Sequence, residues 1–164
     1  MQKSQLLALV EEGFEKAAWH GPNLRSALRG VSAREAAWRP TEGRHNIWEI
    51  SLHAAFWKHT VTLRLTGNQK DKFPEKGRNW FPRYEPNPDS SEATKRWKHD
   101  LALLVRTHRE LCDAIQKLKE SDFTRSAHGC RQTALRNIMG IAMHDAYHAG
   151  QIQLLRKLYC DRAK

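Results

Sequence analysis

The amino-acid sequence predicts an all-α protein, and more narrowly a four-helix bundle. Apolar residues recur at steps of three and four along four long segments, whereas the alternating pattern of a β-strand is almost absent. Helix-capping signals stand before several of these segments. No internal repeat is visible, and 164 residues is an ordinary length for one domain. We therefore expect residues 1–164 to form a single four-helix bundle.

The first helix is expected over residues 4–29, where one apolar stripe runs along the whole span. Gly21 and Pro22 lie inside it, and proline lacks the backbone N–H that a helix interior needs. We expect a kink there, or a break with Pro22 at the first position of a new helical segment. A capping box at residues 32–35 then begins one short turn, which ends before Pro40.

The second helix is expected over residues 47–66, with Asn46 as its N-cap and Gly67 closing it. Residues 67–88 follow as a loop with four prolines, which is far longer than the roughly 2–8 residues that join antiparallel helices in a bundle. Such a loop predicts a crossover that leaves the second and third helices parallel. Its aromatic residues are expected to pack on the helices: Trp80, Phe81 and Tyr84.

The third and fourth helices follow the same periodicity. The third is expected over residues 90–119, with Asp89 as its cap. A second loop covers residues 120–132, and the fourth helix runs over residues 133–160. These two segments complete the predicted bundle.

The composition favours anionic partners without requiring them. Lysine and arginine number 28 against 18 aspartate and glutamate residues, which leaves a net charge of +10. The basic residues form no tract of five or more, so a solvated basic surface explains them equally well. No run of 18 apolar residues predicts a membrane span, and the three scattered cysteines do not suggest disulfides. We expect a reduced, cytoplasmic protein.

Polar side chains occupy the apolar face of the fourth helix. At about 100° per residue, His144, Tyr147, His148 and Gln151 fall within about a third of a turn. Two imidazoles at i and i+4 can share one metal ion, although core histidines bonded to backbone or carboxylate show the same spacing. His53 supplies a third imidazole from the apolar stripe of the second helix. Three neutral imidazoles bind a divalent ion and leave positions open, as a catalytic site does.

Rival sites are weaker. Asp145 takes the glutamate position of a zinc-peptidase motif, but no histidine or glutamate follows His148 to complete such a site. A di-iron bundle needs two Glu-x-x-His motifs on facing helices, and the match at residues 42–45 lies in a loop. His108 and Cys112 share a core stripe without a third ligand, so we expect them to be structural.

Three segments carry a resemblance to a known family. They are WHGP at 19–22 with WRP at 38–40, HNIWEI at 45–50 continuing to HAAFWK at 53–58, and HDAYHAGQI at 144–152. In these segments the chain resembles the DinB family of metal-dependent helical bundles. The last segment is the more specific, because its histidine pair comes with tyrosine, glycine and glutamine in register.

The resemblance implies an up-down-down-up bundle that holds a divalent metal ion, often nickel or zinc, through three histidines. Those ligand positions map onto His53, His144 and His148. Members are often dimeric, so we expect a homodimer. Some relatives are thiol-dependent transferases or isomerases, and others are regarded as hydrolases.

The leading functional hypothesis is a metal-dependent transferase or hydrolase that acts on a small thiol or anionic molecule. In it, Gln151 and Tyr147 orient the substrate or support the metal ligands. The alternative is a stress-related metal-binding protein without turnover. Nucleic-acid binding ranks last, because no recognition helix or basic tract is present.

Overall fold

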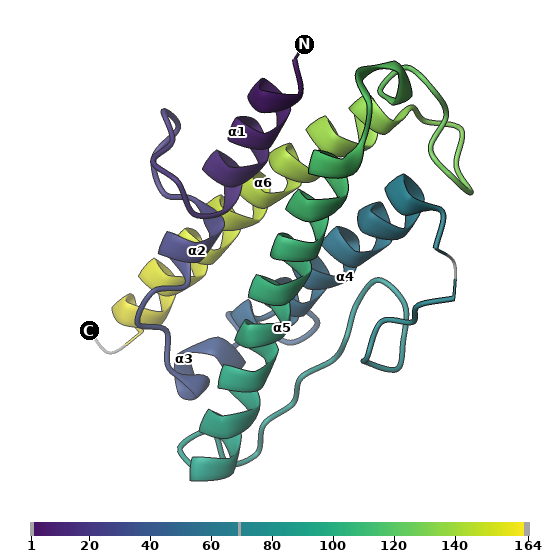
Figure 1. The fold of residues 1–164 in the computed structure, drawn as a ribbon. Helices are drawn as coiled ribbons and strands as arrows, with labels where there is room; N and C mark the ends of the chain where they lie inside the picture. Colours follow the sequence, from purple (N-terminus) through teal and green to yellow (C-terminus); the bar gives the residue numbers. More distant parts are fainter. Residues whose placement is uncertain (1, 69, 163–164) are drawn as a thin grey trace.

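The computed structural model describes residues 2–68 and 70–162, and within them it contains helices and loops but no β-strand (Figure 1). Four long helices carry most of the chain, and two short helices and one 3-10 turn lie in the connections. In chain order the elements are α1 (Lys3–Phe14), α2 (Leu24–Ala27), α3 (Ala33–Ala37), α4 (Ile47–Thr66), α5 (Ser91–Lys117), η1 (Glu120–Asp122) and α6 (Ala134–Asp161). The all-helical prediction is confirmed.

Helices α4 and α5 run in the same direction. The Trp48 indole donates a hydrogen bond to Asp100, and ten residues further along α4 the Lys58 ammonium lies 3.4 Å from a ring nitrogen of His108. When the residue numbers of the contacting partners rise together along both helices, the helices are parallel. The ribbon shows the same direction for both (Figure 1). The predicted parallel pair is therefore present.

Helices α1 and α6 run opposite to that pair. On α6, Arg64 of α4 bonds to Asn137, whereas His53, earlier on α4, meets the later residue His144. On α1, the Lys3 ammonium bonds to main-chain carbonyls at the end of α5. The four long helices thus follow the up-down-down-up order, and the segment between α4 and α5 returns along the bundle to the far end (Figure 1).

The crossover packs on the body with two of its three predicted aromatic residues. Phe81 is buried in the core, and Trp80 is half-buried against α4. Tyr84 is 83% exposed, so the expectation that it packs on the helices is wrong. In an extended segment neighbouring side chains point in opposite directions, and Arg83 takes the inward position, where it bonds to Asp100.

The first predicted helix is wrong over residues 15–23. Helix α1 ends at Phe14, and a separate helix α2 begins after Asn23, whose side chain accepts a hydrogen bond from the Ser26 N–H. Gly21 has a φ of +100°, which ends any helical path at that point. The predicted break is present, but it is wider than one residue and Asn23 begins the new segment.

Both ends of α4 follow their sequence signals, whereas the start of α5 does not. The Asn46 side chain accepts from the Glu49 N–H, and Gly67 closes α4 in the left-handed conformation with φ +73°. Asp89 does not cap α5, because the Ser90 hydroxyl accepts from the Ala93 N–H and takes the N-cap position instead. The predicted start of α5 is therefore early by one residue.

Helix α4 is the central element of the fold. Its residues from Ile47 to Ala55 are all buried, including the polar side chains of Glu49 and His53. A helix that is buried on every side must satisfy its polar groups internally. This position brings His53 into the interior opposite α6. Within the described residues, no helix is both long enough and apolar enough to cross a membrane.

Candidate metal centre

Three imidazoles meet between α4 and α6. The Nε2 atom of His144 lies 3.0 Å from Nε2 of His53 and 3.0 Å from Nε2 of His148. One ligand nitrogen from each ring lies within 4.8 Å of the other two. His53 and His148 are buried, and His144 is partly buried. A tetrahedral zinc site with Zn–N bonds of about 2.05 Å separates its nitrogens by about 3.3 Å. The structure thus brings together the three predicted ligands, and the two distances to His144 are close to that spacing.

Neighbouring groups determine which ring nitrogens carry the proton. Nδ1–H of His53 donates to the main-chain carbonyl of Asn79 at 2.8 Å, because a carbonyl can only accept. Nδ1–H of His148 donates to Oε1 of Gln151 at 2.6 Å. In both neutral rings Nε2 then carries a lone pair, and both lone pairs point towards Nε2 of His144. One proton on His144 satisfies at most one of them, whereas a cation between the rings satisfies all three.

The protonation states also suit metal binding. Burial lowers the pKa of His53, although its bond to the Asn79 carbonyl opposes this shift. Burial, with the other two imidazoles and Lys58 nearby, lowers the pKa of His144 to about 3, and burial lowers that of His148 to about 4. All three rings are neutral at pH 7, which is the form that binds a metal.

Two crossover residues support His53, and the sequence did not identify their role. Asn79 has a φ of +71°, its carbonyl holds the His53 ring, and its side-chain oxygen accepts from the Trp57 indole at 2.8 Å. Trp80 stacks on His53 with ring centres 4.0 Å apart. Asparagine tolerates the left-handed conformation better than most residues, and this is the only sequence signal at Asn79.

The predicted catalytic residues form a hydrogen-bond chain from the third ligand. Gln151 accepts from His148 and donates through its amide nitrogen to the Tyr147 hydroxyl at 3.0 Å. The Tyr147 oxygen is the acceptor in that bond, so its own O–H is free to donate to another group. Tyr147 is 63% exposed, which places this donor at the solvent side of the centre.

A pocket of about 660 Å³ opens over the three imidazoles. Its walls come from α6, from the start of α4, from Trp80 and from the connection that precedes α4. The residues that line it besides the three histidines are Pro40, Thr41, Arg44, His45, Ile50, Trp80, Tyr147, Gln151, Leu154, Leu155 and Leu158. This volume lies within the range of about 300–1,000 Å³ that small-molecule sites occupy.

A model of the DinB superfamily matches residues 17–152. The chain belongs to the DinB superfamily. The match includes all three histidines of the centre and the segments on which the resemblance rested. No curated protein and no solved structure matches the chain.

One polar cluster shapes the pocket wall of this DinB protein without a hydrogen bond to the three histidines of the centre. The Glu49 carboxylate accepts hydrogen bonds from the Arg39 guanidinium, from the Arg83 N–H and from His45. Burial alone would raise the pKa of Glu49, but these bonds lower it overall. His45 in turn stacks on the far face of Trp80 at 3.5 Å, so the cluster holds Trp80 against His53.

A second buried polar cluster lies on the other side of α6. Asp145 and Lys58 form an ion pair that is completely buried, and burial raises the pKa of Asp145 to about 6 although Lys58 opposes the shift. Asp145 therefore pairs with Lys58 on the side of α6 away from the three imidazoles, and it does not act as the base of a zinc-peptidase motif. His108 stacks on Phe14 and lies 3.5 Å from the Cys112 sulfur, which fits the structural role predicted for both.

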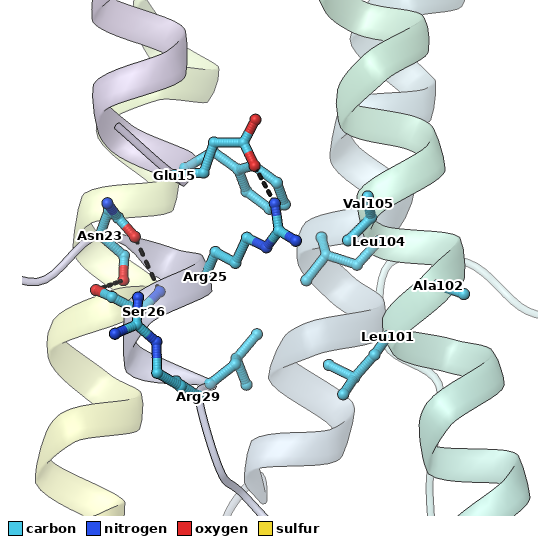
Figure 2. A pocket seen from close by; sticks show the side chains of 11 residues that line it. Glu15, Asn23, Arg25, Ser26, Arg29, Leu101, Ala102, Leu104 and Val105 are labelled. Atoms are coloured by element: carbon cyan, nitrogen blue, oxygen red, sulfur yellow. Dashed lines mark hydrogen bonds and ion pairs between the residues drawn. The ribbon is translucent and has the colours of Figure 1, made fainter. Parts of the chain in front are cut away.

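A further cavity of about 550 Å³ lies between α2 and α5, on the face opened by the break after α1 (Figure 2). Its floor includes Phe14 and Leu104, and its rim carries Arg25 and Arg29. Arg25 is neutralised by Glu15 across the mouth of the cavity (Figure 2). Among the described residues that line this cavity there is no histidine or cysteine, so it lacks the imidazole ligands that the other pocket offers to a metal ion.

Proposed function

We propose that this DinB protein is a divalent-metal-dependent enzyme whose active site is the pocket over His53, His144 and His148. The observation that carries the proposal is the convergence of three imidazoles, with one ligand atom of each within 4.8 Å of the others, at the base of a small-molecule pocket. Three nitrogen ligands leave at least one coordination position for substrate or water, which distinguishes a catalytic site from a closed structural one. Zinc or nickel suits this donor set.

A divalent ion at this point would stabilise negative charge on a bound oxygen or sulfur atom. The protein's own groups have separate roles. Asn79 and Gln151 hold the Nδ1 protons of His53 and His148, which keeps each Nε2 free. The Tyr147 O–H donates a hydrogen bond to a substrate oxygen at the pocket mouth, and we assign Gln151 the task of orienting that hydroxyl.

The reaction class we favour is transfer to or from a small thiol or anionic molecule, or hydrolysis. The family relationship supports a small-molecule substrate, and the pocket has the size for one. A cytoplasmic location and a homodimer remain part of the proposal. The net charge of +10 agrees with an anionic substrate.

The first test is elemental analysis of freshly purified protein, followed by titration of Zn²⁺ and Ni²⁺ into chelator-treated protein. We expect about one ion per chain in the wild type and a small fraction of that in His148→Ala, because two imidazoles bind far less tightly than three. His99→Ala is the matched control, since His99 is exposed on α5 and outside the centre. Full metal content in a correctly folded His148→Ala variant would refute the assignment.

The second test is a screen of the loaded enzyme against thiol-transfer and hydrolysis substrates. We expect activity that disappears in His148→Ala and persists in His99→Ala. Saturable metal binding without turnover on any substrate of the panel would favour the non-catalytic alternative.

A further inference from the structure

One wall of the metal pocket is an exposed apolar stripe. Leu154 and Leu158 stand one turn apart on α6 and are 59% and 43% exposed, although leucine is normally buried. They continue the line of Tyr147 and Gln151, at steps of three and four along the same face of α6. Because both leucines line the pocket, they can contact the apolar part of a ligand bound there.

The same pocket also carries a positive charge, that of Arg44. Arg44 lines the wall contributed by the connection before α4, and no ion pair of its side chain is found among the described residues. The described residues that line the pocket include no aspartate or glutamate. The neighbouring Arg39, in contrast, is neutralised by the buried Glu49. A bound divalent ion would add further positive charge, so the electrostatics select against cationic ligands.

We infer that the ligand of this pocket is an amphipathic organic anion, with its charged group at Arg44 and an apolar body against Leu154 and Leu158. The inference rests on the proposed function, because it takes the pocket over the three histidines as the substrate site. The Tyr147 hydroxyl supplies a neutral donor to the polar end of the same molecule. Concave walls and a volume of about 660 Å³ favour a small molecule over a flat protein surface.

The test uses a set of probes that separate charge from apolar length: n-octanesulfonate, ethanesulfonate and octyltrimethylammonium. A sulfonate keeps its charge at all accessible pH values and is a poor ligand for the metal. Isothermal titration measures each dissociation constant with metal-loaded and with chelator-treated protein. Each buried methylene contributes about fourfold in affinity. We expect octanesulfonate to bind at least tenfold more tightly than ethanesulfonate and at least tenfold more tightly than octyltrimethylammonium.

Two variants with matched controls assign the two ends of the ligand. Arg44→Gln should weaken octanesulfonate about fivefold to tenfold and remove the preference for the anion, while Arg131→Gln, an exposed arginine outside the pocket, should change neither. Leu158→Ser should weaken octanesulfonate several-fold and leave ethanesulfonate unchanged. Met143→Ser is its control, because Met143 is 67% exposed on α6 but does not line the pocket.

Three results would overturn the inference. One is equal affinity of the wild type for the octyl anion and the octyl cation. Another is identical behaviour of Arg44→Gln and Arg131→Gln. The third is a wild-type dimer, by light scattering, that Leu158→Ser dissociates, since a second copy would then cover the stripe. Circular dichroism and thermal unfolding confirm that each variant folds.

Failure of the metal function gives a different pattern. Suppose that the metal-free protein prefers the octyl anion and that His148→Ala keeps its full metal content. This pair of results would refute the three-histidine centre and support the ligand class. If His148→Ala loses its bound metal as expected but the wild type shows no preference for the anion, the result would support the three-histidine centre and refute the ligand class.

Discussion

Asn79 offers the sharpest test of how the crossover supports the metal centre. Its main-chain carbonyl accepts from Nδ1 of His53, and its side chain accepts from the Trp57 indole, so one residue joins the loop to α4 at two points. Its φ of +71° suits asparagine and glycine, whereas alanine in this left-handed conformation destabilises the folded state by about 1–2 kcal/mol. Asn79→Ala and Asn79→Gly therefore separate the strain from the lost hydrogen bond.

The magnitudes follow from these contacts. Both variants leave the half-buried Trp57 N–H without its partner, which costs about 1–3 kcal/mol. Only Asn79→Ala adds the backbone strain, so it should weaken the docking of the loop by about 2–5 kcal/mol in all. When the loop detaches, His53 loses the acceptor of its Nδ1 proton, and loss of such a partner typically lowers metal affinity 10–100-fold.

The assay is a competitive titration of Zn²⁺ against a chromophoric chelator, with urea unfolding in parallel. We expect metal affinity to fall in the order wild type, Asn79→Gly, Asn79→Ala. Asn87→Ala is the control, because Asn87 is an exposed asparagine of the same connection whose side chain forms no hydrogen bond in the described structure. If Asn79→Ala binds Zn²⁺ as tightly as Asn87→Ala does, the supporting role of Asn79 is refuted.

Three further predictions concern stability. Gly13→Ala should cost about 1–3 kcal/mol in urea unfolding, because its Cβ would lie 2.9 Å from the main-chain oxygen of Ala142; an unchanged midpoint would contradict the close packing of α1 on α6. Lys58→Met should cost about 3–5 kcal/mol by leaving the Asp145 charge buried and unpaired, while adding Asp145→Leu should recover most of that loss; equal losses in the single and double variants would contradict this. The pKa of Glu49 is lowered in the folded state, so its contribution to stability is present above about pH 4.3 and disappears as the pH falls through the folded pKa. Unfolding of Glu49→Gln between pH 6 and pH 3 should therefore depend less on pH than that of the wild type, and parallel curves would argue against this role.

The three histidines could be predicted from the sequence because each depends on local periodicity. His144 and His148 are one helical turn apart, and the apolar residues around them show which side of α6 faces inward. His53 follows from the same argument on α4. The parallel direction of α4 and α5 could also be predicted, since the length of a connection limits which helix ends it can join.

The extent of the first helix could not be predicted from periodicity alone. Leu24 and Leu28 continue the apolar stripe of α1 and are indeed buried, so the pattern stays intact although the helix is broken. A buried face persists whether its residues belong to one helix or to two packed on the same core. The hydrogen bond from the Ser26 N–H to the Asn23 side chain decides where the second segment begins.

The sequence by itself determined the helical class, the parallel direction of α4 and α5 and the three imidazoles of the centre. Only the tertiary structure decided which groups hold those imidazoles. Asn79 and Trp80 lie in a proline-rich loop without periodicity, and they reach His53 across 26 and 27 positions of the chain. Helical periodicity specifies faces, and therefore residues within a few turns of one another. Contacts from an irregular loop depend on where the loop docks, and long-range packing alone sets that.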